Sequence, residues 1–100
     1  MKIKTIDVQA KEWFDKTYGN SYFSMLITIN YQLKNEATIF VPMQYGYGDH
    51  FRDMAFKELQ KKKFIPVQEN NISYWQYYED KNIIARHSKH ENCLKRELKY

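Results

Sequence analysis

The chain has 100 residues, of which 43% are hydrophobic, 17% are aromatic and 28% are charged, with a formal net charge of +4. This length gives one domain with a single core, and the apolar content excludes a disordered chain. No segment approaches the roughly 18 consecutive apolar residues of a membrane span. The charged start of the sequence lacks the apolar region of a signal peptide, and a single cysteine allows no internal disulfide. We therefore expect a cytoplasmic domain.

Three segments in the first half of the chain predict strands, because apolar residues recur at every second position. The first runs toward Trp13 and Phe14 and alternates at Ile6, Val8 and Ala10. The second follows turn residues 18–21 and carries Phe23, Met25, Ile27, Ile29 and Tyr31 on one side. The third follows a turn at 34–36 and carries Ala37, Ile39, Val41 and Met43, with Pro42 indicating an edge strand or a strand end. Short connections between these strands predict an antiparallel meander.

The apolar spacing then changes from that of a strand to that of a helix. Asp49 is a suitable N-cap, and Phe51, Ala55 and Leu59 recur at helical intervals, so we predict an amphipathic helix over residues 50–62. Three lysines, Lys61 to Lys63, suit the negative end of its dipole. Pro66 prevents the helix from continuing.

The secondary structure of the last third of the chain is harder to predict from the sequence. Residues 70–82 are rich in aromatic residues, which favour a strand, yet a cap at Asn71 or Ser73 and a stop at Asn82 favour a helix, which we prefer. Residues 83–87 predict a short fourth strand, and residues 89–100 a short helix with Leu94 and Leu98 on one side. The expected fold is α+β: an antiparallel sheet of three to four strands, with one main helix and one or two shorter helices packed on one face.

The whole net charge lies in residues 81–100, which hold six Lys and Arg against two Glu, while residues 1–80 are neutral. A local excess of this kind suits an acidic protein surface or a polyanion, although it also describes a solvated basic segment. The candidate binding residues of this region are Arg86, His87, Lys89, Lys95 and Arg96. A secondary basic cluster is formed by Lys61, Lys62 and Lys63.

Aromatic side chains supply the other half of a candidate interface, because interfaces with proteins and with single-stranded nucleic acids use them as anchors. We single out Tyr45, Tyr47, Trp75, Tyr77 and Tyr78 as candidate anchors. They would share a surface with the basic residues if the fourth strand lies beside the 70–82 element. The alternative is that aromatic residues fill the core, which we expect of Trp13, Phe23, Tyr31, Phe51 and also of Trp75.

Two motifs resemble catalytic or metal sites without meeting their requirements. The two glycines in residues 46–50 precede a helix, as in anion-binding loops, but no P-loop Lys-Ser/Thr pair follows. His87, His90 and Cys93 are spaced three apart, which spreads them over about 120° of a helix, too far for one tetrahedral ion. We therefore predict no metal, no cofactor and no catalytic residue; a small enzyme acting at Gly46–His50 is the third and weakest hypothesis.

As a whole, the chain resembles small phage- or prophage-encoded proteins. The stretches that carry the resemblance are residues 10–16, 19–23, 44–50 and 91–97. Proteins of this kind that lack catalytic motifs often bind a machine of the bacterial host, as anti-CRISPR inhibitors of host defence do. Many such inhibitors imitate DNA with an acidic surface, whereas this chain is basic. The resemblance therefore implies contact with an acidic protein patch, or with nucleic acid inside a complex.

Two functional hypotheses follow. In the first, the protein is a non-enzymatic accessory protein that binds, and so inhibits or modulates, a host protein or nucleoprotein complex. In the second, it is a nucleic-acid-binding module in which the basic segment contacts phosphates beside exposed aromatic residues.

Overall fold

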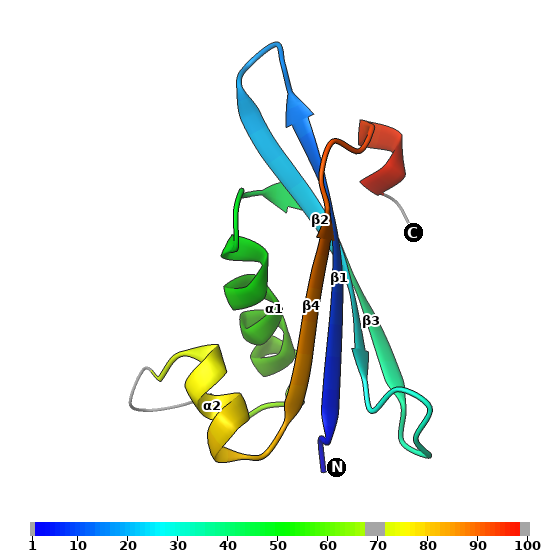
Figure 1. Cartoon of the computed structure of the whole chain (residues 1–100), viewed down its shortest axis with the longest axis vertical. Helices are drawn as coiled ribbons and strands as arrows, with labels where there is room; N and C mark the ends of the chain where they lie inside the picture. Colours follow the sequence, from blue (N-terminus) through cyan, green and yellow to red (C-terminus); the bar gives the residue numbers. More distant parts are fainter. Residues whose placement is uncertain (1, 68–71, 99–100) are drawn as a thin grey trace.

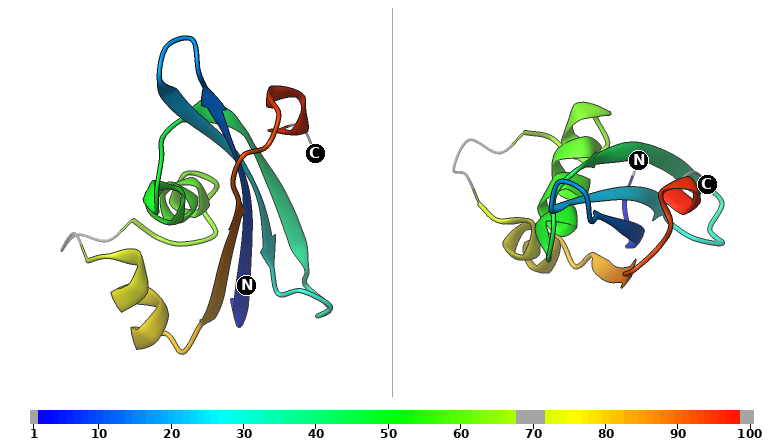
Figure 2. Two further views of the ribbon diagram at one scale, coloured as in Figure 1. Left: turned by 45° about the horizontal axis from the view of Figure 1, so that its top comes forward. Right: turned by 90° about the horizontal axis from the view of Figure 1, so that it is seen from above.

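The computed structural model describes residues 2–67 and 72–98. Its elements in chain order are β1 (Thr5–Asp15), β2 (Asn20–Ile29), β3 (Ala37–Tyr45), α1 (His50–Lys61), α2 (Tyr74–Asp80), β4 (Ile84–His90) and the 3₁₀ helix η1 (Lys95–Leu98). The strands form one mixed sheet in the order β3-β2-β1-β4 (Figure 1). Helices α1 and α2 cover one face of this sheet, and η1 lies on the opposite side (Figure 2). The α+β class is therefore confirmed.

The meander predicted for the first half of the chain is confirmed. Strands β1 and β2 pair antiparallel from Ile6↔Ile29 to Asp15↔Asn20, and β3 pairs antiparallel with β2. Because side chains alternate across a strand, the apolar series of β1 and β2 enters the core beneath the helices. Pro42 lies on an edge strand, as predicted. Tyr31 does not continue β2, which ends at Ile29, and 54% of Tyr31 is exposed.

The fourth strand pairs parallel with β1, from Thr5↔Ile84 to Lys11↔His90, so the prediction of a fully antiparallel sheet is wrong. It also runs to His90 rather than ending at residue 87. The physical reason is the long connection at residues 46–83. Parallel strands need a crossover of a dozen or more residues that contains a helix, and this connection carries α1 and α2 across one face from β3 to the far side of β1.

Both helices on the covered face agree with the sequence predictions. α1 buries Phe51, Ala55, Phe56 and Leu59, and it begins after Asp49, although the Asp49 side chain makes no capping hydrogen bond. The 70–82 region is helical, over Tyr74–Asp80, and its chain turns at Asn82 with φ 55°. Its predicted start at residues 70–71 lies outside the described residues.

The prediction of a helix over residues 89–100 is wrong for most of its described length. β4 continues to His90, and only Lys95–Leu98 is helical, as one 3₁₀ turn. Leu98 is buried (2% exposed) whereas Leu94 is 52% exposed, so the two do not form a common apolar side. η1 contacts β1 and β2 on the face away from α1, which corrects the expectation of helices on one face only.

Within the described residues, no helix combines the length and the apolar character required to cross a membrane.

Candidate interface on the outer sheet face

The face of the sheet opposite α1 and α2, called the outer face below, carries a row of three aromatic side chains. Trp13 of β1, Tyr22 of β2 and Tyr45 of β3 occupy matched positions of adjacent strands. The rings of Trp13 and Tyr22 stack with their centroids 5.6 Å apart, and Tyr22 meets Tyr45 edge-on at 6.0 Å. Tyr45 is 60% exposed. We call these three residues the aromatic row.

Lys95 connects η1 to this row. Its ammonium lies 5.4 Å from the centre of the Trp13 ring, which is the geometry of a cation–π contact. The start of η1 is fixed by Glu97, whose Oε1 accepts a hydrogen bond from the Leu94 N–H at 2.8 Å. No described carboxylate forms an ion pair with Lys95 or Arg96. The end of the sheet that carries η1 therefore presents aromatic rings together with two unneutralised cations.

Arg86, another predicted binding residue, lies on the outer face but forms an ion pair within the chain. Its Nε and Nη2 donate to the two carboxylate oxygens of Asp7 at 2.6 and 3.0 Å. Asp7 and Arg86 are register partners on β1 and β4, which explains the pairing of residues 79 positions apart. This bidentate contact neutralises the guanidinium.

Lys89 lies on the covered face, with its side chain only 12% exposed. Its Nζ donates to the Gly48 carbonyl at 2.9 Å and lies 3.5 and 3.4 Å from carboxylate oxygens of Glu12 and Glu91. The prediction that Lys89 belongs to an exposed basic surface is therefore wrong. The residue fastens β4 to the loop that precedes α1.

His87 lies between the sheet and both helices. Its ring is 6.1 Å from that of Phe51, 5.8 Å from Tyr74 and 6.4 Å from Tyr78. Burial among these rings, together with the nearby Arg52 cation, lowers the pKa of His87 to about 4. His87 is thus a neutral packing residue and not the contact residue predicted.

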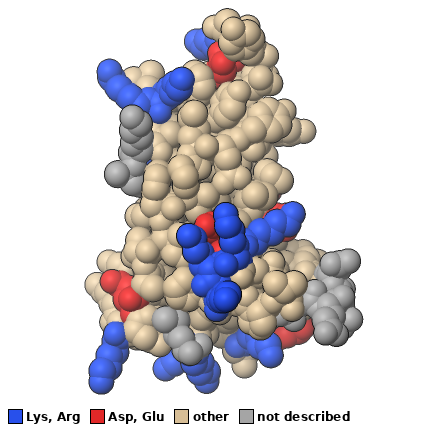
Figure 3. Space-filling model, turned by 180° about the vertical axis from the view of Figure 1, so that it is seen from behind, with Lys and Arg blue, Asp and Glu red and all other residues tan. Residues whose placement is uncertain are grey.

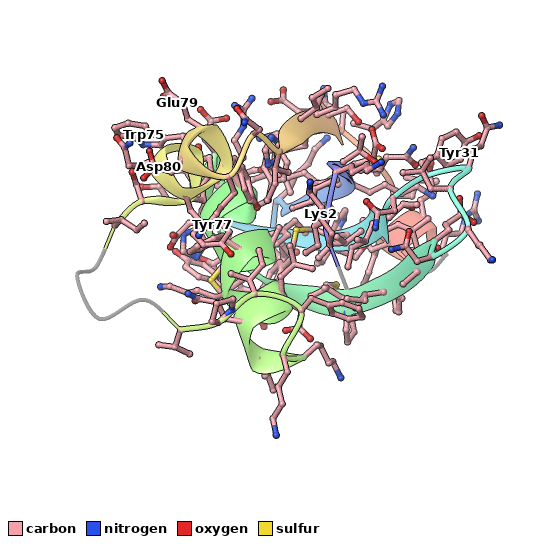
Figure 4. The ribbon with its side chains drawn as sticks, turned by 90° about the horizontal axis from the view of Figure 1, so that it is seen from below. Lys2, Tyr31, Trp75, Tyr77, Glu79 and Asp80 are labelled. Atoms are coloured by element: carbon pink, nitrogen blue, oxygen red, sulfur yellow. The ribbon has the colours of Figure 1, made fainter. Side chains whose placement is uncertain are left out.

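Of the aromatic residues predicted on α2, only Trp75 is accessible. Tyr77 and Tyr78 are 7% and 4% exposed and pack on Phe56, so an exposed role for them is wrong. Burial raises the pKa of both hydroxyls. Trp75 is 58% exposed, which contradicts a core position, and it lies with Glu79 on the outer side of α2 while Tyr77 points inward (Figure 4).

The basic and aromatic candidates therefore do not share one surface. Trp75 belongs to the helical layer, and Arg86 points to the outer face of the sheet. Lys61, Lys62 and Lys63 are exposed at the end of α1. Figure 3 shows basic side chains over the C-terminal part of α1, well apart from those at the end of the sheet where η1 lies.

The loop between β3 and α1 forms a hollow of about 360 Å³ that is lined by Tyr45, Gly46, Tyr47 and His50. Gly46 is required there, because a Cβ would lie 2.5 Å from Phe23 Cε1 and 2.8 Å from His50 Cδ2. Tyr47 is 70% exposed, as an anchor would be. Tyr45 is the end member of the aromatic row, and Tyr47 lines this hollow together with it.

The spaced residues His87, His90 and Cys93 do not converge. His87 and His90 project from opposite faces of β4, because three positions separate them on a strand. The Cys93 thiol donates to the His90 carbonyl at 3.3 Å. No group of three potential metal ligands occurs among residues 2–67 and 72–98.

In comparisons with known proteins, no family model, no curated protein and no solved structure matches the chain. The outer face is therefore interpreted from its own residues.

Sequence reasoning missed two members of the aromatic row. Trp13 was expected in the core, and Tyr22 was not singled out. The alternation in β1 does indicate the position of Trp13. Like Asp7 and Lys11, Trp13 lies at an odd-numbered position, whereas the apolar series of β1 lies at even-numbered positions and therefore on the other face. The tight turn at residues 16–19 then places Tyr22 opposite Trp13.

Proposed function

We propose that this protein acts without catalysis, by stoichiometric binding of a host protein or nucleoprotein complex through its outer face. The observation that carries the proposal is the aromatic row beside Lys95 and Arg96, on the sheet face that α1 and α2 leave uncovered. Large rigid aromatic residues and arginine are the residue types enriched at the energetic centres of protein interfaces.

The exposed apolar surface around the row supports this proposal. Phe40, Met43 and Leu94 are each between 41% and 52% exposed, and all lie near the row or η1. Single exposed apolar residues are ordinary, but several on one side of a small domain are typical of an interaction surface.

A protein partner agrees with the contacts better than direct binding of nucleic acid. The Trp13 ring already has Tyr22 against it and Lys95 over it, which leaves little of its surface for a base. Arg86 and Lys89 already pair with carboxylates and would have to exchange these for phosphates. The remaining cations, Lys95 and Arg96, suit a modest acidic patch on a protein.

The resemblance to small phage-encoded proteins supplies the biological context for this proposal. It makes a bacterial defence complex, of the kind that anti-CRISPR proteins inhibit, the first partner to test. Since the chain is basic, its partner surface would be acidic and would not be one that binds a DNA mimic.

The proposal is tested by pull-down from bacterial lysate with the tagged protein, with and without nuclease. We expect Tyr45→Ala combined with Lys95→Glu to lose the captured partner, while Trp75→Ala, an equally exposed aromatic on α2, retains it. Capture that survives nuclease and depends on Tyr45 and Lys95 supports a protein partner. Capture that disappears with nuclease supports direct nucleic-acid binding, and equal capture by all variants excludes the outer face.

If nucleic acid is contacted directly, affinity for a single-stranded probe must also fall steeply with salt, because phosphate contacts release counterions. A gel-shift titration at low salt provides this measurement. Absence of a shift removes the nucleic-acid alternative.

A further inference from the structure

Beside the aromatic row, β3 and η1 enclose a second hollow on the outer face. It has a volume of about 370 Å³ and is lined by Phe40, Pro42, Met43, Lys95 and Leu98. Its walls are mainly apolar, and Leu98 at its base is 2% exposed, so the floor is a packed part of the molecule. Among the described residues of the lining, Lys95 alone is charged.

The shape of the hollow comes from an irregularity in β3. Met25 pairs with Val41 whereas Phe23 pairs with Gln44, so Pro42 and Met43 together oppose the single residue Ser24. Such a bulge bends a strand and redirects its side chains. Here the bulge lies beside η1, and Met43 remains 41% exposed at the rim.

The same bulge determines how a partner can approach. β3 is an edge strand, and an unprotected edge invites another strand to add to the sheet. Pro42 has no N–H to donate, so strand addition is blocked at the hollow. An occupant must therefore insert side chains from above the sheet.

The charges around the hollow indicate the chemistry of the occupant. Lys95 and Arg96 have no ion pair with a described carboxylate, and Glu97 next to them is occupied by the Leu94 N–H. The Lys95 ammonium contacts the Trp13 ring but no described carboxylate neutralises it. An apolar hollow with such a cation at its rim is complementary to an apolar side chain that is followed or preceded by a carboxylate. A volume near the lower limit of ligand pockets fits one or two such side chains.

We infer that this hollow is the docking site for a short acidic peptide segment of the partner, which inserts a large apolar side chain between β3 and η1 and pairs a carboxylate with Lys95. This inference rests on the proposed function and specifies which chemistry the partner presents. The aromatic row lies on the same face of the sheet and would extend the contact beyond the hollow.

The test is an NMR titration of the ¹⁵N-labelled full chain with the synthetic peptide acetyl-DLDFD-amide, and with acetyl-KLKFK-amide as the matched control. We expect the acidic peptide to shift the amides of Phe40, Met43 and Leu98 with saturation at a Kd on the order of 1 mM or tighter. Lys95→Glu should weaken this binding at least tenfold. Met43→Lys, which places a charge on the exposed rim without disturbing the core, should abolish the shifts at Leu98.

Equal shifts with the lysine peptide, shifts confined to other regions, or no shift at 5 mM would overturn the inference. So would displacement of the acidic peptide by the oligonucleotide dT8, or a concentration-dependent dimer in sedimentation that occupies these residues. The two proposals fail separately. If Met43→Lys still captures the partner while Tyr45→Ala with Lys95→Glu does not, the outer face is the interface and the hollow is not its docking site.

Discussion

Asn30 is the polar side chain that joins the start of β1 to the end of β2. It is fully buried, and its Oδ1 accepts hydrogen bonds from the N–H groups of Lys4 and Thr5 at 2.7 and 3.3 Å. Its Nδ2 donates to the Lys2 carbonyl and to Asn35 Oδ1, both at 3.0 Å. Its φ of 54° is one that asparagine tolerates better than most residues. One side chain thus satisfies three backbone groups of residues 2–5 and the side-chain oxygen of Asn35.

We predict that Asn30→Gly lowers the free energy of unfolding by about 2–4 kcal/mol, because it removes these hydrogen bonds and leaves buried groups unpaired. Glycine tolerates positive φ, so backbone strain does not contribute. Asn82→Gly is the control, since Asn82 has φ 55° but is exposed, and we expect a change within about 0.5 kcal/mol. Urea denaturation measures both; equal losses would show that the side-chain contacts of Asn30 do not matter.

At the scale of elements, the contact that fastens β4 to the loop before α1 is made by Lys89. The cation bridges the Gly48 carbonyl and the carboxylates of Glu12 and Glu91, and its ammonium lies 5.9 Å from the centre of the Phe51 ring. The loop that follows Tyr45 is thereby held from the covered side of the sheet.

We predict that Lys89→Met destabilises the protein by about 2 kcal/mol, because it leaves the poorly exposed Glu12 carboxylate without its partner. Hydrogen exchange should accelerate at residues 46–49. Arg86→Met is the matched control, since its side chain is 62% exposed and such pairs contribute less than about 1 kcal/mol. Comparable losses in the two variants would contradict the role assigned to Lys89.

How well each element could be predicted depended on how far apart in the sequence its contacting residues lie. Alternation at Ile6 to Ala10 specified a half-buried strand, because that pattern is a property of the strand itself. The partner and direction of β4 could not be predicted, since the pairing of Ile84 with Thr5 joins residues 79 positions apart. Lys89 and Arg86 are both single basic residues in the sequence. Only the register of β4 against β1 shows that Lys89 faces the helices and is poorly exposed, whereas Arg86 faces outward.

At the scale of the whole molecule, His87 is the point where the sheet, α1 and α2 meet. Besides the three surrounding rings, the charged groups that act on it are Arg52, which lowers its pKa, and Asp49, which raises it. Burial is the largest effect. The two layers of the molecule are therefore packed around a histidine that must remain neutral.

The sign of the resulting pH dependence follows from linkage. The pKa of His87 is about 4 in the folded protein and 6.5 in the unfolded chain, so the unfolded state binds more protons between these values and stability falls as the pH drops from 6.5 to 4. We expect a loss on the order of 2 kcal/mol, reduced from the full linkage value because the ring keeps some solvent contact.

Thermal unfolding of His87→Gln and of the control His90→Gln between pH 7 and pH 4 checks this prediction. His90 is exposed on the opposite face of β4, so its variant should retain the full pH dependence of the wild type. His87→Gln should reduce the dependence of stability on pH, whatever the stability of this variant at pH 7. Parallel curves for the two variants would refute the assignment.

The candidate site could be predicted only in part, because a binding surface depends on how all the elements assemble. Tyr45, Tyr47, Lys95 and Arg96 were identified from residue type and are exposed; Tyr45 and Tyr47 line one hollow, and Lys95 contacts the Trp13 end of the aromatic row. Tyr77 and Tyr78 have the same chemistry but are buried against Phe56 of α1. A helix placed by a long crossover gives no local sign of which side it buries.

The parallel pairing of β1 with β4 has a consequence for synthesis of the chain. β1 leaves the ribosome before the strand that covers its second edge, which follows 79 residues later. At about 5–20 residues per second, that interval is on the order of 10 s. During it, the nascent meander exposes the backbone of β1 along an open edge, so the sheet can be completed only after most of the chain has been translated.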